Sequence, residues 1–99
     1  MATFSISVWT VREGREREFE TAWRELSEYT AVQMVGRKEP SRLLRDRDQP
    51  NRFVSVAQWD SADTIRAWRA GPAFSERVAR MGGLLEDFSP MTLDDVTKP

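Results

Sequence analysis

The segment 53–61 (FVSVAQWDS) alternates like a β-strand and ends at a serine that can cap a helix. Side chains alternate across a strand, so its valines face one side of the sheet, while Ser55, Ala57 and Trp59 face the other. The second face sets two small residues beside a large ring. In a densely packed interior, such a gap is filled by a neighbouring bulky group or left for a ligand. We expect Trp59 to form one wall of that space.

Hydrophobic periodicity divides the rest of the chain into strands and helices. Alternating residues predict strands at 3–11, 41–45, 52–59 and 89–96. Helical spacing predicts one helix over 15–31 and a second helical region from Ser61 to Gly82–Gly83, broken in two at Gly71–Pro72. This order predicts one α+β domain over residues 1–99, with a ferredoxin-like split βαββαβ fold and a four-stranded antiparallel sheet.

Two of the predicted strands are apolar on both faces. The helices of this topology cover one face of the sheet, and the other carries Phe4, Ile6, Val8, Val54 and Val56. An isolated copy would expose this patch to water, at about 25 cal/mol for each Å² of apolar surface. We therefore expect a homodimer in which two sheets pack face to face.

Composition narrows the possible chemistry. The chain has no Cys and no His, so we expect no disulfide, no thiolate nucleophile, no metal site and no histidine base. The formal net charge is −1, with no basic stripe, and we expect no nucleic-acid partner. No apolar run is long enough to span a membrane and no signal peptide is visible, which predicts a cytoplasmic protein without a membrane partner.

The segment 57–61 (AQWDS), with Trp68 and the break at Gly71–Pro72 after it, resembles the antibiotic biosynthesis monooxygenase family. The resemblance implies a dimeric α/β barrel with a ligand pocket between the sheet and the helices of each subunit. It further implies a small oxidoreductase that oxidises an aromatic, polyketide-type phenol without cofactor, metal or flavin. In that reaction, the deprotonated substrate itself reduces dioxygen.

Two chemistries occur in the family that this chain resembles, and its residues match each in part. Heme-degrading members carry a helix Trp, matched by Trp68, but Val78 stands at the position of their axial His and Ser7 at that of a strand Asn. Heme degradation is thus the third and least favoured interpretation.

Members that oxidise phenols to quinones carry a Trp at the end of the strand, matched by Trp59. Ser55 replaces their strand Asn, Ile65 falls at a Tyr, and Arg77 and Arg80 lie near an Arg.

These matches give a set of candidate residues. A serine hydroxyl can hydrogen-bond a phenol or quinone oxygen, and a fixed cation favours a phenolate. The candidates for catalysis are Trp59, Ser55, Arg77 and Arg80, and those for binding a small aromatic substrate are Ser7, Trp9, Trp68 and Ile65.

A second interpretation needs no reaction. The tryptophans can simply be core residues and the serines can bond backbone, which would leave a non-catalytic dimeric module that binds a small hydrophobic metabolite. The absence of His, Cys and the Asn of the family favours this alternative.

Overall fold

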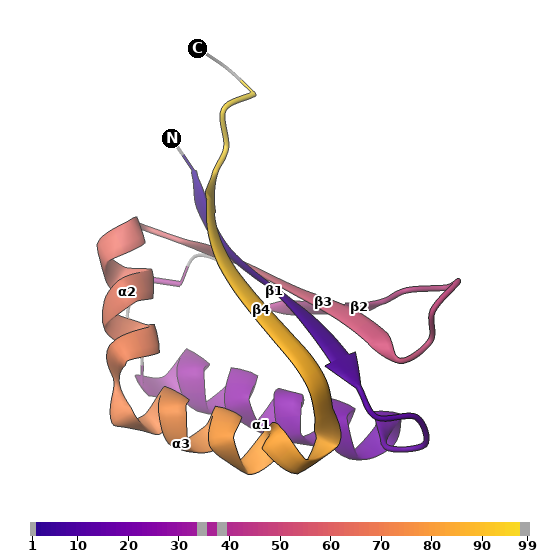
Figure 1. Cartoon of the computed structure of the whole chain (residues 1–99). Helices are drawn as coiled ribbons and strands as arrows, with labels where there is room; N and C mark the ends of the chain where they lie inside the picture. Colours follow the sequence, from indigo (N-terminus) through magenta and orange to yellow (C-terminus); the bar gives the residue numbers. More distant parts are fainter. Residues whose placement is uncertain (1, 34–35, 38–39, 98–99) are drawn as a thin grey trace.

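The computed structural model describes residues 2–33, 36–37 and 40–97. Figure 1 shows a twisted sheet with helices on one side. The elements in chain order are β1 (Thr3–Val11), α1 (Glu16–Gln33), β2 (Arg42–Arg45), β3 (Arg52–Trp59), α2 (Ala62–Ala70), α3 (Pro72–Met81) and β4 (Leu85–Asp94). The strand order is β2-β3-β1-β4 and all three pairings are antiparallel, which confirms the predicted ferredoxin-like fold.

The break between α2 and α3 lies where the sequence predicts it. Ser61 accepts a hydrogen bond from the backbone N–H of Thr64 at 3.1 Å and so caps α2. Gly71 ends α2 and precedes α3, and Pro72 occupies the first turn of α3, where its missing N–H costs no helical bond.

The last strand differs from its prediction over 89–96. After a short 3₁₀ turn at Gly82–Leu84, β4 begins at Leu85 and ends at Asp94. Charged residues hide its start in the sequence, because β4 is an edge strand and those side chains face solvent. Phe88 nevertheless stacks on Trp9 with ring centroids 4.3 Å apart, which fixes the first half of β4 over the core.

The core lies between the sheet and the helices. Alternate residues of β1 are buried on the helix side, as the period of a strand requires. The main cluster of buried residues consists of Trp9, Val11, Phe19, Trp23, Leu26, Phe53 and Met81. A second, smaller cluster, made of Ala57, Trp59 and Ile65, lies toward α2.

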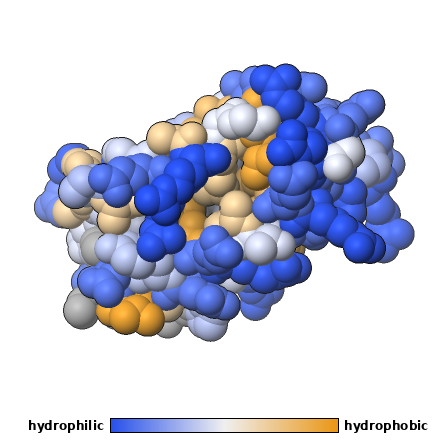
Figure 2. Space-filling view, turned by 90° about the horizontal axis from the view of Figure 1, so that it is seen from below, coloured by the Kyte–Doolittle hydropathy of each residue, from blue (hydrophilic) through white to orange (hydrophobic). Residues whose placement is uncertain are grey.

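The helical underside of the molecule is mostly hydrophilic. Figure 2 shows this face, with apolar groups visible in a narrow band between hydrophilic ones. Partly buried Ala22, Phe74 and Val78 pack against the main core from α1 and α3. The amphipathic helices thus bury their apolar sides against the sheet and leave little apolar surface here.

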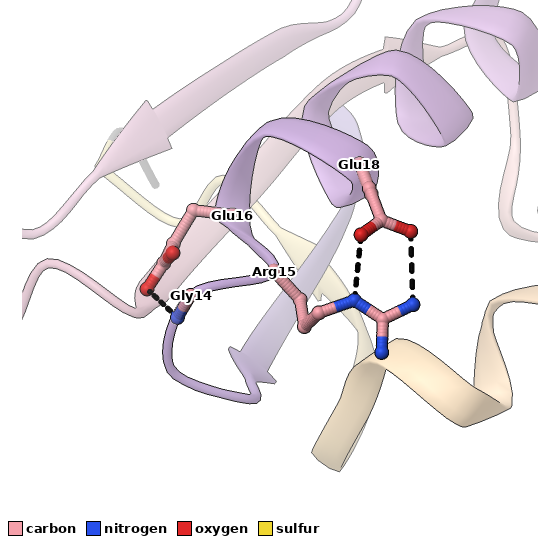
Figure 3. Close-up of polar contacts among 4 residues, drawn as sticks. All are labelled: Gly14, Arg15, Glu16 and Glu18. Carbon is pink, nitrogen blue, oxygen red and sulfur yellow. Dashed lines mark hydrogen bonds and ion pairs between the residues drawn. The ribbon is translucent and has the colours of Figure 1, made fainter.

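The start of α1 is fixed by contacts that Figure 3 shows. Gly14, at φ +88°, donates its N–H to the Glu16 carboxylate at 3.1 Å. Arg15 binds the carboxylate of Glu18 through two hydrogen bonds of 2.7 and 2.9 Å, and this pairing lowers the pKa of Glu18. Apart from the half-buried Glu16 these residues are exposed, so their contacts mark where the helix begins and contribute little to stability.

Candidate functional site

A pocket lies between the helix side of β1 and β3 and the helices above it. Its cavity volume is about 30 Å³, and all the empty space between the lining atoms, open solvent included, amounts to about 400 Å³. Small residues of the strands form the floor (Ser5, Ser7, Ser55, Ala57), aromatic rings the walls (Trp9, Trp23, Trp59, Trp68, Phe74), and polar groups one side (Ser27, Thr30, Arg37, Ser41).

Two indole-to-serine hydrogen bonds cross the floor of the pocket. Trp9 donates its Nε1–H to Ser55 Oγ, and Trp59 donates its Nε1–H to Ser5 Oγ, both at 2.9 Å. In each case the tryptophan and the serine lie on neighbouring strands, two positions apart in register. Each serine oxygen therefore accepts from an indole and keeps its own O–H free to donate.

Ser7 lies between these two bonds, directly opposite Ser55 in the β1–β3 register. It makes no hydrogen bond with any residue that the structure describes, and its oxygen is not among the described buried polar atoms that lack a partner. The Ser7 hydroxyl is therefore open to the pocket. Ser5, Ser7 and Ser55 together give the floor three hydroxyl groups that can donate to an oxygen of a ligand.

The aromatic wall on the α2 side closes most of the hollow. Trp68 packs between Trp59 and Phe74, with ring centroids 5.0 and 4.5 Å apart. Its Nε1–H donates to Thr30 Oγ1 at 3.2 Å, and Thr30 donates in turn to the Leu26 carbonyl at 2.8 Å. This chain of contacts links α2 to α1 across the pocket.

Arg37 is the titratable residue among the described residues that line the pocket. It pairs with Trp59 in an isolated β-bridge, and the preceding Gly36 accepts a 2.7 Å hydrogen bond from the Asp60 N–H. Its Nη1 donates to Ser41 Oγ at 2.7 Å and weakly to Ser27 at 3.4 Å. Burial lowers the pKa of Arg37 because it disfavours the charged form.

The structure brings together five of the eight residues that the sequence nominates. These five line the pocket: Ser7, Trp9, Ser55, Trp59 and Trp68. Ile65 is fully buried in the small cluster behind Trp59 and does not line the pocket.

The two nominated arginines lie elsewhere on α3. Arg77 places its guanidinium over the Tyr29 ring, 4.1 Å from the centroid, and neither Arg77 nor Arg80 lines the pocket. The family resemblance nominated them without a fixed register, and α3 places Arg77 against Tyr29 and leaves Arg80 exposed to solvent. Among the described residues that line the pocket, the cation is Arg37.

The residues on the polar side of the pocket were not predicted as site residues from the sequence. Arg37 and Ser41 belong to the connection between α1 and β2, which has no periodicity to orient them. Ser27 and Thr30 lie within α1, and the helical pattern of the sequence does not distinguish them as pocket residues. One signal was present: Gly36, at φ +108°, marks a sharp reversal of the backbone immediately before Arg37.

The described ranges contain neither a metal-binding cluster nor a membrane-spanning helix. Within them, no group of three or more His, Cys, Asp or Glu side chains is arranged to hold a metal ion. No helix in the described part of the chain is both long and apolar enough to cross a membrane.

Solved structures share this fold at low sequence identity. SnoaB, a cofactor-independent oxygenase from Streptomyces nogalater, is 24% identical with a TM-score of 0.84, over 98% of this chain and 95% of SnoaB. A putative antibiotic biosynthesis monooxygenase from Bordetella bronchiseptica is 21% identical with a TM-score of 0.82, over 96% of this chain and 97% of the other. One from Nitrosomonas europaea is 14% identical with a TM-score of 0.82, over 97% and 91%. These similarities establish the fold.

A search of curated protein sequences found no match. A profile described as antibiotic biosynthesis monooxygenase, however, matches residues 4–80, most of the chain and all elements from β1 to α3. It spans the serine floor and the aromatic walls of the pocket. The chain therefore belongs to the antibiotic biosynthesis monooxygenase family.

Proposed function

We propose that this protein is a cofactor-independent monooxygenase that oxidises an aromatic, anthrone-type phenol in the pocket. Family membership supports a small monooxygenase in general. The observation that carries the finer proposal is the floor of three hydroxyl donors, Ser5, Ser7 and Ser55, beneath aromatic walls. Such a floor suits a flat ring whose oxygen becomes negatively charged during the reaction.

The proposed reaction consumes dioxygen and needs no other oxidant. Loss of a proton from the ring CH₂ of the phenol gives a delocalised anion, whose carbon attacks O₂ and forms a C–O bond. The peroxide takes up a proton to become a hydroperoxide. Its O–O bond then breaks as the second C–H proton and the hydroxyl leave together as water. The carbon becomes a carbonyl, so CH₂ and O₂ yield C=O and H₂O.

The side chains of the pocket would assist by stabilising the negative charge of the substrate and by excluding water. Hydroxyl donors fixed in position stabilise an oxyanion without reorganising. The aromatic walls exclude water from the reactive anion. Apart from Arg37, no described lining residue titrates, so the proton leaves to water or to the substrate's own groups.

This arrangement predicts how the rate depends on pH and on Ser7. Because the substrate supplies the ionising group, oxygen uptake should rise with pH through the substrate's own pKa. The midpoint should move when a more acidic anthrone is used. Ser7→Ala should lower kcat about tenfold, which corresponds to one lost charge-assisted hydrogen bond. Ser75→Ala, at an exposed serine of α3 outside the pocket lining, is the matched control and should have no effect.

Oxygen consumption with quinone formation, followed from pH 5 to 10, checks both expectations. Absence of any turnover of anthrones by the parent protein would contradict the proposal. So would a pH midpoint that stays fixed when the substrate is changed.

A second candidate, the non-catalytic binding module, is favoured by the small cavity volume of about 30 Å³. Binding of phenols without oxygen uptake would select this alternative.

We further propose that the protein acts as a homodimer formed through the sheet face opposite the helices. On that face Phe4, Ile6 and Val8 are only partly buried, and Met91 and Leu93 of the adjacent β4 are 37% and 42% exposed. A contiguous group of exposed apolar side chains on one face of a sheet is typical of a protein–protein interface.

A further inference from the structure

Arg37 is held in place by Ser27 and Ser41, and no carboxylate of the described residues pairs with it. Its Nη1 donates to Ser41 at 2.7 Å and weakly to Ser27 at 3.4 Å. None of the ion pairs among the described residues includes Arg37. A guanidinium that is partly buried beside aromatic rings thus keeps its charge without a neutralising partner in the described part of the chain.

The remaining donors of Arg37 have no acceptor among the described residues. All of its described hydrogen bonds come from Nη1, which leaves Nε–H and the Nη2 hydrogens without one. Arg37 lines the hollow, so a ligand there can reach its guanidinium. Nε and Nη2 form one edge of the guanidinium fork, and this edge matches the two oxygens of a carboxylate.

We propose that Arg37 forms a subsite for a carboxylate substituent of the aromatic substrate, at the opposite side of the pocket from the phenol. This inference rests on the proposed function and names the class of substrate more closely, as hydroxylated aromatic acids. The hydroxyls of Ser41 and Ser27 accept from Nη1 and keep their own hydrogens, so they can donate to the same carboxylate.

A carboxylate fits this edge better than the phenolate does. The phenolate has a single oxygen, and the serine floor already offers it hydroxyl donors. The guanidinium edge presents two parallel N–H groups, and a planar carboxylate uses both. The burial that lowers the pKa of Arg37 also makes the unpaired cation costly, and an anion bound there removes that cost.

Calorimetric titration with two ligands of nearly equal shape, and a third that lacks their substituent, tests the subsite. They are 6-hydroxy-2-naphthoate, its neutral analogue 6-hydroxy-2-naphthamide, and 2-naphthol, and in the first two the substituent is remote from the phenol. The parent protein should bind the carboxylate at least about tenfold more tightly than the amide. Added NaCl should weaken only the carboxylate.

The matched variants are Arg37→Gln, Arg37→Lys and Arg24→Gln. Arg37→Gln should abolish the preference for the carboxylate and leave the affinity for the amide and for 2-naphthol unchanged. Arg37→Lys should retain part of the preference, since it keeps the charge and loses the fork. Arg24→Gln, at an exposed arginine of α1, should behave like the parent.

The outcomes separate this inference from the function on which it rests. If the amide and 2-naphthol bind but the carboxylate binds no better, the subsite is wrong and the aromatic pocket stands. Equal weakening of all three ligands by Arg37→Gln also overturns the subsite, because Arg37 would then act on the shared phenol. If none of the three binds the parent protein, both proposals fail. The salt dependence of the parent decides the question even if Arg37→Gln does not fold.

Discussion

Trp9 and Trp59 have already used their indole N–H groups before any ligand arrives. Each donates to a serine on the neighbouring strand, Ser55 and Ser5 respectively. These tryptophans therefore cannot donate to a substrate without breaking a bond within the sheet. Their role in the pocket is to supply apolar walls and to orient the serine hydroxyls.

Trp59→Phe should cost more stability than Trp23→Phe. Both changes remove ring area from a buried tryptophan, but Trp59 also donates a hydrogen bond to Ser5, which is only 6% exposed. Trp23 makes no hydrogen bond from its indole to a described residue. The difference in the free energy of unfolding should be about 1 kcal/mol, measured by urea denaturation. Equal losses in the two variants would show that the Trp59–Ser5 bond is not stabilising.

Among the connections between elements, Gly36–Arg37 matters most for the site. It attaches to the end of β3 through the Arg37–Trp59 bridge and the 2.7 Å hydrogen bond from Asp60 N to Gly36 O. A Cβ on Gly36 would lie 2.8 Å from the Asp60 carboxylate, which itself accepts a 2.7 Å bond from Thr64 Oγ1. The close approach depends on glycine.

Gly36→Ala should destabilise the protein more than Gly14→Ala. Both glycines have positive φ, so both variants pay about 1 kcal/mol of backbone strain. A Cβ at Gly14 meets nothing within 4 Å, whereas one at Gly36 must displace Asp60, at about 1 kcal/mol more. Thermal or urea unfolding of both variants measures the difference. Identical losses would mean that Asp60 moves aside freely.

The sequence predicts helices and strands well where the hydrophobic period is strong. It predicts them poorly in solvent-exposed edge strands and in the connections between elements. The faces of β1 and β3 follow from alternation, and the Gly71–Pro72 break follows from backbone chemistry. The first residues of β4 were missed because an edge strand tolerates charges such as Glu86 and Asp87.

The floor and the aromatic walls of the candidate site could be predicted from the sequence, but its polar side could not. Ser7, Ser55 and Trp59 share a strand face, so alternation places them together. Arg37 could not be placed, because a tertiary contact with Trp59 holds it and no local pattern encodes that contact. Arg77 and Arg80 lie on a helix whose rotation about its axis the sequence leaves open.

For the molecule as a whole, the most important feature is the sheet face that the helices leave uncovered. In Figure 1 the helices lie on one side of the sheet and no element covers the other. A homodimer through this face would join the two sheets, and folding would then be coupled to association.

Ile6→Asp should therefore abolish the soluble dimer and give unfolded or aggregated protein. The charge would be buried against a partner sheet, with nothing to neutralise it. The control is Val32→Asp, at a residue of α1 that is 79% exposed, and it should leave association and stability unchanged. Sedimentation and circular dichroism report both properties. A parent protein that sediments as a stable monomer at micromolar concentration would contradict the dimer.

The packing of Trp68 between Trp59 and Phe74 sets a limit on how tightly any ligand can bind. Because the cavity volume is only about 30 Å³, we expect a bicyclic ring to fit only after this stack opens. The observed affinity is then the intrinsic affinity reduced by the fraction of molecules that are open. Substitutions that tighten the stack would raise the melting temperature and weaken binding together, so selection for a more robust protein would work against capture of its substrate.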